Sequence, residues 1–235
     1  MVNNSLKKIG VIFLELLIRI AGREIIVPDT IVNVWIVVIL LILFTFVVNS
    51  KIKKANAKEI PSNFLNIVEL LVEASEGLVK TTMGPQNMSF SPYILTLIVF
   101  LLVANLFGLL GFSPPTSDYS VTFSLALITF VLTQYWKFKN SGNLFSYLKG
   151  YTEPMALLTP LNIIGDLANP ISLSFRLFGN VMSGGIIMAL IYEGAGFVAP
   201  VIAAPLHTYF DVFSGVLQTF IFTMLSMIFI GGREA

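Results

Sequence analysis

Residues 155–192 read MALLTPLNIIGDLANPISLSFRLFGNVMSGGIIMALIY. Within this stretch only Asp166 and Arg176 are charged. A continuous helix of this length would extend about 57 Å, whereas the hydrocarbon core of a bilayer is about 30 Å thick. The stretch is therefore expected to cross a membrane as a helix that tilts, protrudes or bends, and Pro160 and Pro170 are places where it can bend.

Four more apolar stretches lie at residues 31–48, 93–112, 121–136 and 200–230. Hydrophobic residues make up 56% of the chain and charged residues 11%, against roughly 25% charged in an average globular protein. The mean hydropathy of +0.86 agrees. This composition predicts an all-α polytopic membrane protein with about five transmembrane helices, of which the last two are long and tilted. Residues 31–235 are expected to form one membrane domain.

Residues 61–83 predict an amphipathic helix that does not cross the membrane. Polar side chains recur there at intervals of three and four residues, at Asn66, Glu69, Glu73, Glu76 and Lys80. Apolar side chains occupy the opposite face, which is typical of a helix that lies on the cytoplasmic membrane surface. Its acidic face could instead dock a partner.

Residues 1–30 are expected to be an N-terminal interfacial or extracytoplasmic segment. Lys7 and Lys8 precede an apolar stretch, as in a signal peptide. Glu15 and Arg19 interrupt that stretch at a spacing at which a helix would pair them. An interfacial or re-entrant helix is therefore the preferred interpretation of residues 1–24.

The loops carry an alternating charge pattern. Residues 49–60 contain four lysines, residues 137–153 contain three, and Arg233 follows the last span. The loops at 113–120 and 193–199 contain neither lysine nor arginine. By the positive-inside rule, the lysine loops and the C-terminus are cytoplasmic and the N-terminus is outside. The positive charges near the N-terminus, from Lys7 to Arg23, run against this placement.

Several function classes are excluded. With a net charge of +1, the chain lacks the excess of basic residues that is typical of nucleic-acid-binding proteins. The sequence has no cysteine and a single histidine, so thiolate sites and histidine-rich metal clusters are absent. It also lacks the GxSxG, HExxH and GxxxxGK[ST] motifs. We therefore expect no cofactor, no resident metal and no catalytic residue.

Arg176 is the most informative polar residue, because it lies well inside its apolar stretch. An arginine at the centre of a spanning helix costs about 2.5–3.5 kcal/mol, so such residues are functional by default. By its spacing, Arg176 shares a helix face with Ser172, Asn180 and Ser183. The following Gly184 and Gly185 permit close approach by another helix. The alternatives are snorkelling of Arg176 to an interface and ordinary packing of the glycines.

The last apolar stretch carries a second polar face, formed by His207, Asp211, Ser214 and Gln218 at spacings of four, three and four residues. These groups can hold a file of water or coordinate a cation, so a transient Na⁺ path near Asp211, Ser214 and Gln218 is conceivable. Asn105 and Asp166 are further polar points within apolar stretches. Each fits an interhelical hydrogen bond on its own, which is the favoured interpretation for Asn105. Together these residues predict an ion path.

The run Pro170-Ile-Ser-Leu-Ser-Phe-Arg176-Leu-Phe-Gly-Asn180 closely resembles the signature of subunit a of bacterial F-type ATP synthases, in which Arg-Leu-x-x-Asn follows a proline and a short Ser/Leu stretch. The segments that begin at Asn105, Ser113 and Pro160 are also similar, as are the surroundings of Gln218. The resemblance covers about residues 60–232.

The resemblance implies a stator subunit whose two long tilted helices face a ring of c subunits. Two offset half-channels would carry H⁺ or Na⁺ to and from the ring carboxylates, and Arg176 would separate the channels. The residues assigned to ion translocation are Arg176, Asn180, Asp211, Gln218, Ser172, His207, Asn105 and Asp166. Implied partners are the c-ring, the peripheral-stalk b subunits, the rest of the ATP synthase and the lipid bilayer of a bacterial cell membrane. Nucleotide chemistry would belong to other subunits.

Two positions depart from the family pattern. Many bacterial members have a glutamate nine residues after the arginine and a histidine seven residues before the glutamine; here these positions are Gly185 and Asp211. The outer half-channel carboxylate would then have moved to the last helix, with His207 supplying an imidazole one turn away. Asp166 would be the acid on the inner side.

Two other functions were considered. A stand-alone secondary transporter or channel would need inverted repeats or broken helices, and no repeat is visible. A purely structural assembly protein leaves Arg176 unexplained.

Overall fold

The computed structural model describes residues 16–20, 23–55, 62–153 and 155–231. Within them, five helical segments are long and apolar enough to cross a membrane. They begin and end at Asp29–Lys54, Pro85–Leu110, Tyr119–Ser141, Ala156–Gly194 and Gly196–Gly231. The prediction of an all-α polytopic membrane protein is confirmed, and the five predicted spans correspond to these segments.

The helices of the first half are α2 (Asp29–Lys54), α3 (Asn63–Thr82) and α4 (Ser91–Leu106). A short 3-10 helix, Pro85–Phe90, precedes α4, and two others, Phe107–Leu110 and Pro115–Ser117, follow it. The predicted amphipathic helix is α3, whose first turn is capped by the Ser62 hydroxyl accepting from the Leu65 amide. Its position at a membrane surface stays a prediction.

The second half holds the helices that carry the polar residues. They are α5 (Tyr119–Ser141), the short α6 (Leu144–Gly150), α7 (Thr159–Gly194), α8 (Ala199–His207) and α9 (Gly215–Gly231). Single turns at Ala156–Leu158 and Gly196–Val198 precede α7 and α8. The helix α7 continues through Pro170 without interruption.

The last span is not one regular α-helix. A π-helical segment, Thr208–Ser214, joins α8 to α9 and contains Asp211. Pro205 precedes it inside α8 and cannot donate a backbone hydrogen bond. Because π-turns inside helices are rare and frequent at functional sites, the irregularity draws attention to this part of the chain.

The expected helix over residues 1–24 is wrong where the structure describes it. Residues 1–15, including Glu15, lie outside the described residues. The strands β1 (Leu16–Ile20) and β2 (Arg23–Val27) form an antiparallel hairpin with Leu16 opposite Val27. Both strands are rich in isoleucine, valine or leucine and are separated by two residues, the commonest length of a hairpin connection. The division into residues 1–30 and 31–235 stays a prediction.

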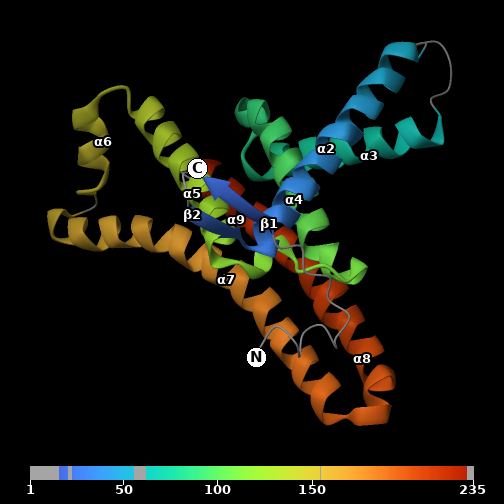
Figure 1. Cartoon of the computed structure of the whole chain (residues 1–235). Coiled ribbons are helices and arrows are strands. Elements are labelled where there is room, and N and C mark those ends of the chain that lie inside the picture. The colour runs from blue at the N-terminus through green and yellow to red at the C-terminus, as the bar shows by residue number, and fades with distance from the viewer. Residues whose placement is uncertain (1–15, 21–22, 56–61, 154, 232–235) are drawn as a thin grey trace.

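The hydrophobic core lies where α4, α5, α7 and α9 cross (Figure 1). Its buried residues are Leu97, Leu101, Ala126, Leu173, Leu177 and Phe222. A second cluster attaches α3 to α4 and α9 through Val79, Met83, Ile94, Met227 and Ile230. Outside these clusters the helices present many large apolar side chains, as expected for surfaces that face lipid or other subunits.

Polar contacts attach α2 to this bundle, because only Thr30, Asn33 and Val37 of α2 are buried. The Ser113 hydroxyl donates to Asp29 at 2.6 Å and the Thr30 hydroxyl donates to Asp118 at 2.9 Å. The Asn33 amide donates to the Ser113 carbonyl at 2.8 Å.

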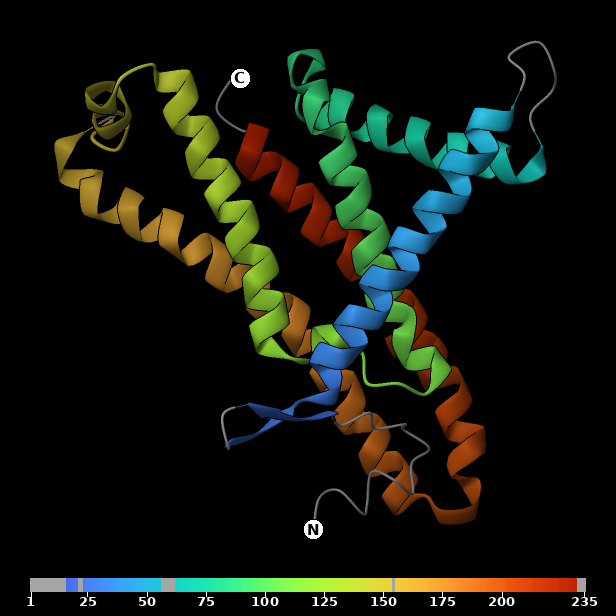
Figure 2. The same cartoon turned by 45° about the horizontal axis from the view of Figure 1, so that its top comes forward.

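Figure 2 shows the two ends of the bundle. The C-terminal end of α2, α6 and the last turn of α9 lie at one end. The strands β1 and β2 and the α7–α8 connection lie at the other. The lysines in the last turn of α2 and the lysine-bearing segment from the end of α5 to α6 are thus at the same end of the bundle. Residues 56–61, which include Lys58, and the tail with Arg233 lie outside the described residues.

Candidate functional site

Arg176 lies near the middle of α7, 17 residues after Thr159 and 18 before Gly194. Its side chain is exposed, and within the described residues it makes neither an ion pair nor a hydrogen bond. Each helix end is about 25 Å away along the axis, beyond the reach of an arginine side chain. Since an unpaired arginine among apolar surroundings is costly, this geometry requires water or an anion from beyond the described residues.

A cavity of ≈ 710 Å³ opens beside the C-terminal half of α7. Helix α8, the π-helical segment, the start of α9 and the segment after α4 form its other walls. Six of the polar residues singled out in the sequence line it: Asn105, Asn180, His207, Asp211, Ser214 and Gln218. We call it the outer cavity. The structure thus brings together side chains from three separate parts of the chain.

Asp211 and His207 form a hydrogen bond at the wall of the outer cavity, which is an ion pair when His207 is protonated. The distance from His207 Nδ1 to Asp211 Oδ2 is 2.6 Å, and the side chains are 38% and 23% exposed for His207 and Asp211 respectively. On the other face of the ring, His207 Nε2 lies 3.0 Å from the Tyr192 hydroxyl. The three groups form a continuous hydrogen-bonded chain from α7 to the π-helical segment. In the sequence, Tyr192 marks only the end of an apolar stretch, and no pattern there predicts its contact with His207.

Deeper in the outer cavity, Asn180 contacts Gln218. The Asn180 amide donates to Gln218 Oε1 at 2.8 Å, and Gln218 is buried. The Nε2 of Gln218 has no hydrogen-bond partner within the described part of the chain. A buried, unpaired donor that lines a cavity needs water or another acceptor there. Asn180 follows Arg176 by one helical turn, so the polar lining of the outer cavity begins one turn from the arginine.

Asn105 makes hydrogen bonds between helices, which is the role that the sequence favoured for it. Its Nδ2 donates to the Gly215 carbonyl at 3.1 Å and to the Thr219 hydroxyl at 3.0 Å. Its Oδ1 accepts from the Thr116 hydroxyl at 2.8 Å. These contacts bind α4 and the 3-10 turn at Pro115–Ser117 to α9.

The two glycines after Ser183 play different parts. A Cβ on Gly184 would lie 3.2 Å from Phe210, so Gly184 permits close packing of α7 on the π-helical segment. A Cβ on Gly185 would meet nothing within 4 Å among the described residues, and Gly185 lines the outer cavity together with Asp211. A carboxylate at position 185 or at position 211 would therefore face the same space.

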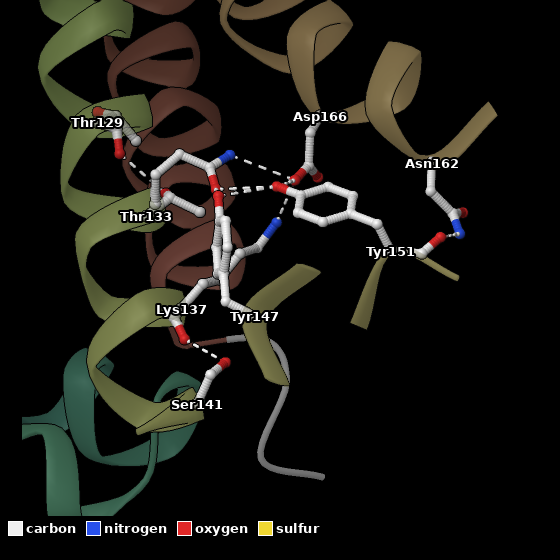
Figure 3. Close-up of polar contacts among 9 residues, drawn as sticks. Thr129, Thr133, Lys137, Ser141, Tyr147, Tyr151, Asn162 and Asp166 are labelled. Carbon is white, nitrogen blue, oxygen red and sulfur yellow. Dashed lines mark hydrogen bonds and ion pairs between the residues drawn. The ribbon is translucent and has the colours of Figure 1, made fainter. Parts of the chain in front are cut away.

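A second cavity, of ≈ 720 Å³, lies at the other end of the bundle between α5, α6, the start of α7 and the end of α9. We call it the inner cavity. Asp166 lines it and accepts from Lys137 at 2.6 Å, Tyr151 at 2.8 Å and Gln134 at 3.2 Å (Figure 3). Burial, then hydrogen bonds to Tyr147 and Asp166, raise the pKa of Tyr151 well above its usual range, so its hydroxyl stays protonated. Lys137 was counted in the sequence only as a loop charge, and Tyr151 was not noticed.

Arg176 lies between the two cavities along α7. The inner cavity is lined by Asp166 and Asn169, and the outer cavity by Asn180 and later residues, whereas Arg176 lines neither. Ser172 is exposed one turn before Arg176 and also lies outside both cavities. Ser183 donates to the Asn180 carbonyl at 3.2 Å.

A family model described as the ATP synthase A chain matches residues 31–231. The chain belongs to this family. It is 36% identical over 222 residues to "ATP synthase subunit a, sodium ion specific" of Propionigenium modestum, covering 88% of this chain and 74% of that one. It is 34% identical over 209 residues to "ATP synthase subunit a" of Trichlorobacter lovleyi, covering 87% and 86%. The protein named "ATP synthase subunit a" of Mycoplasma pneumoniae is 33% identical over 234 residues, covering 88% and 80%.

The resemblance noted in the sequence is thereby confirmed as membership of subunit a of bacterial F-type ATP synthases. Members of this family are ion-translocating membrane subunits of the ATP synthase stator and are not catalytic by themselves. Five spans and family membership together make this chain a multi-pass membrane protein of the ATP synthase complex.

Proposed function

We propose that this subunit a provides two offset half-channels that carry a monovalent cation, H⁺ or Na⁺, to and from carboxylates of a c-ring. The outer cavity is the half-channel from the extracytoplasmic side, and the inner cavity is the half-channel from the cytoplasm. Arg176 separates them and couples ion flow to rotation. The c-ring and the peripheral-stalk b subunits are its proposed partners in the cell membrane.

The observation that supports this proposal most strongly is the environment of Arg176. The arginine is exposed and, within the described residues, unpaired in the middle of a long apolar helix, between two polar cavities toward opposite ends of the bundle. Its missing counter-charge would be the carboxylate of each passing c subunit. A cation within roughly 4–6 Å lowers the pKa of a carboxylate by about 1–3 units, which helps that carboxylate release its ion.

Arginine suits this position better than lysine for two reasons. Its guanidinium does not lose its proton even when poorly hydrated, and it is more weakly hydrated than an ammonium, so approaching the ring costs less desolvation. A fixed positive charge between the half-channels would also repel a cation that moved directly from one to the other.

Asp211 is the proposed titrating or ion-relaying carboxylate of the outer half-channel. It faces the same cavity as Gly185, where many family members have a glutamate, so the carboxylate function would be preserved on the opposite wall. Ser214 and Gln218 line that cavity with it and could serve a proton or Na⁺. Sodium dependence of ATP hydrolysis by the intact complex would distinguish the two ions.

The test is ATP-driven pumping by the intact ATP synthase in membrane vesicles. Arg176→Ala should abolish pumping while the complex still assembles, and Arg176→Lys should also impair coupling. Lys139→Gln, which also removes a positive charge but at an exposed position that lines neither cavity, is the matched control and should pump nearly normally. Near-normal pumping by Arg176→Ala would refute the proposal. Transport by the isolated, reconstituted chain would favour a stand-alone transporter or channel instead.

A further inference from the structure

The contacts of Asp166 converge on one carboxylate oxygen. Lys137 and Gln134 of α5, together with Tyr151 just after α6, all donate to Oδ2 (Figure 3). The side chains of Lys137 and Asp166 are each 17% exposed. Asp166 thus joins α5 and the connection that follows it to α7, which makes it the centre of a junction between three segments.

Further hydrogen bonds extend this junction on both sides. The Tyr147 hydroxyl of α6 donates to Gln134 Oε1 at 2.9 Å. The Asn162 amide of α7 donates to the Tyr151 carbonyl at 2.8 Å and to the Glu153 carbonyl at 3.2 Å. Helix α6 has no buried residue of its own. The position of the α5–α7 connection therefore depends on these polar contacts more than on apolar packing.

The same connection forms part of the wall of the inner cavity, through Tyr147, Gly150, Tyr151 and Glu153. An acid that exchanges the transported ion must be able to bind and release that ion. At Asp166 three donors already occupy Oδ2, and one of them is the ammonium of Lys137 at 2.6 Å. The positive charge of Lys137 offsets the negative charge of the carboxylate, which weakens the attraction of Asp166 for a passing cation.

We propose that Asp166 is a positioning residue that fastens the α5–α7 connection at the mouth of the inner cavity, and that its ion pair with Lys137 offsets its charge so that ions pass without being exchanged there. This inference rests on the proposed function of the inner cavity. It replaces the role of inner-side acid that the sequence suggested for Asp166.

A double-mutant cycle separates the two roles. Removing one member of a poorly exposed ion pair leaves the other charge uncompensated, whereas replacing both members removes that penalty. In intact ATP synthase, Asp166→Asn and Lys137→Gln should each lower ATP-driven ion flux per assembled complex by about tenfold. The double variant should recover most of the wild-type flux, since an asparagine and a glutamine can still hydrogen-bond. Lys139→Gln, an exposed neighbour that lies over Trp136, is the control and should leave flux unchanged.

If Asp166 instead binds and releases the transported ion, the double variant is expected not to recover flux. If flux in the double variant stays as low as in Asp166→Asn, a carboxylate at position 166 is required and the proposal is overturned. If the single variants do not assemble, recovery of assembly and flux by the double variant decides the same question. Normal pumping by Arg176→Ala would instead refute the proposed function, so the two failures are distinguishable.

Proteolysis tests the fastening directly and needs no ion flux. Trypsin should cleave after the exposed Lys149 severalfold faster in Asp166→Asn and in Tyr151→Phe than in the wild-type complex, because the connection is released. The double variant should return toward the wild-type rate. Tyr135→Phe, an exposed tyrosine of α5, is the control. Unchanged cleavage in Asp166→Asn would contradict the fastening role.

Discussion

The outer and inner cavities each contain a carboxylate oxygen 2.6 Å from a nitrogen of a basic side chain, but the two carboxylates differ in their partners. In the outer cavity Asp211 contacts the imidazole of His207, which is charged only when it is protonated. In the inner cavity Asp166 contacts the ammonium of Lys137 and two further donors. The outer pair is also more exposed, at 38% and 23% against 17% for both members of the inner pair.

The two carboxylates lie at the same distance from a basic nitrogen, but their different surroundings suit them to different roles. Asp211 contacts one side chain and lines an open cavity, where it can interact with a cation. Asp166 accepts from three side chains, and one of them is a lysine. The outer carboxylate is therefore suited to ion exchange and the inner one to holding segments together.

The largest expected difference between the cavities is in their carboxylate variants. Asp211→Asn should lower ion flux per assembled complex by more than about tenfold, since no other carboxylate among the described residues lines the outer cavity. Passive tightness of the membrane should be retained, because Arg176 is unchanged. Flux assays normalised to assembled enzyme measure this effect. Unchanged normalised flux would reduce Asp211 to a packing residue and remove the contrast with Asp166.

A double variant tests whether the carboxylate of the outer cavity can lie at position 185 instead of position 211. Gly185→Glu combined with Asp211→His recreates the commoner bacterial arrangement, and both positions line the same cavity. The combination should recover part of the flux lost in Asp211→Asn, measured in the same normalised assay. No recovery would show that the two positions are not interchangeable.

A smaller effect is expected from His207→Gln, which keeps a hydrogen-bonding group near Asp211 but removes the ring that contacts both Asp211 and Tyr192. Flux per assembled complex should fall about threefold, because Asp211 itself is retained while the hydrogen-bonded chain to Tyr192 is interrupted. The normalised flux assay checks the prediction. A loss as large as in Asp211→Asn would show that the imidazole is as necessary as the carboxylate.

The smallest effect on turnover is expected for Asn105→Ala. The variant loses three hydrogen bonds and leaves the buried hydroxyl of Thr116 without its acceptor, at a cost of about 1–3 kcal/mol. The yield of assembled complex should fall, while flux per assembled complex should stay close to that of the wild type. A loss of normalised flux would assign Asn105 to the ion path itself.

The sequence predicted the spans well, because the length of an apolar run is a direct consequence of bilayer thickness. Helical spacing also predicted that His207, Asp211, Ser214 and Gln218 share a face, and all four line the outer cavity. Their role in ion translocation stays a prediction. The partners of Asp166 could not be found in this way. Lys137 and Tyr151 are 29 and 15 residues distant, and only the packing of α5, α6 and α7 brings them together.

Two local features were missed for different reasons. The β1–β2 hairpin was taken for a helix, because a possible Glu15–Arg19 pair was given more weight than the β-branched residues that follow. The π-helical segment at Thr208–Ser214 leaves no periodic signature in a stretch that is apolar on most sides. Only Pro205 hinted at an irregular backbone.

The central claim is that Arg176 separates two ion-accessible cavities, and passive ion permeability tests it most directly. Membrane vesicles stripped of the soluble ATPase subunits, with the c-ring retained, should conduct ions at least about tenfold faster with Arg176→Ala than with the wild-type chain, because the repelling charge is gone. Vesicles with Asp211→Asn should remain as tight as the wild type. If Arg176→Ala vesicles are equally tight, Arg176 is not the barrier between the cavities and the account is wrong.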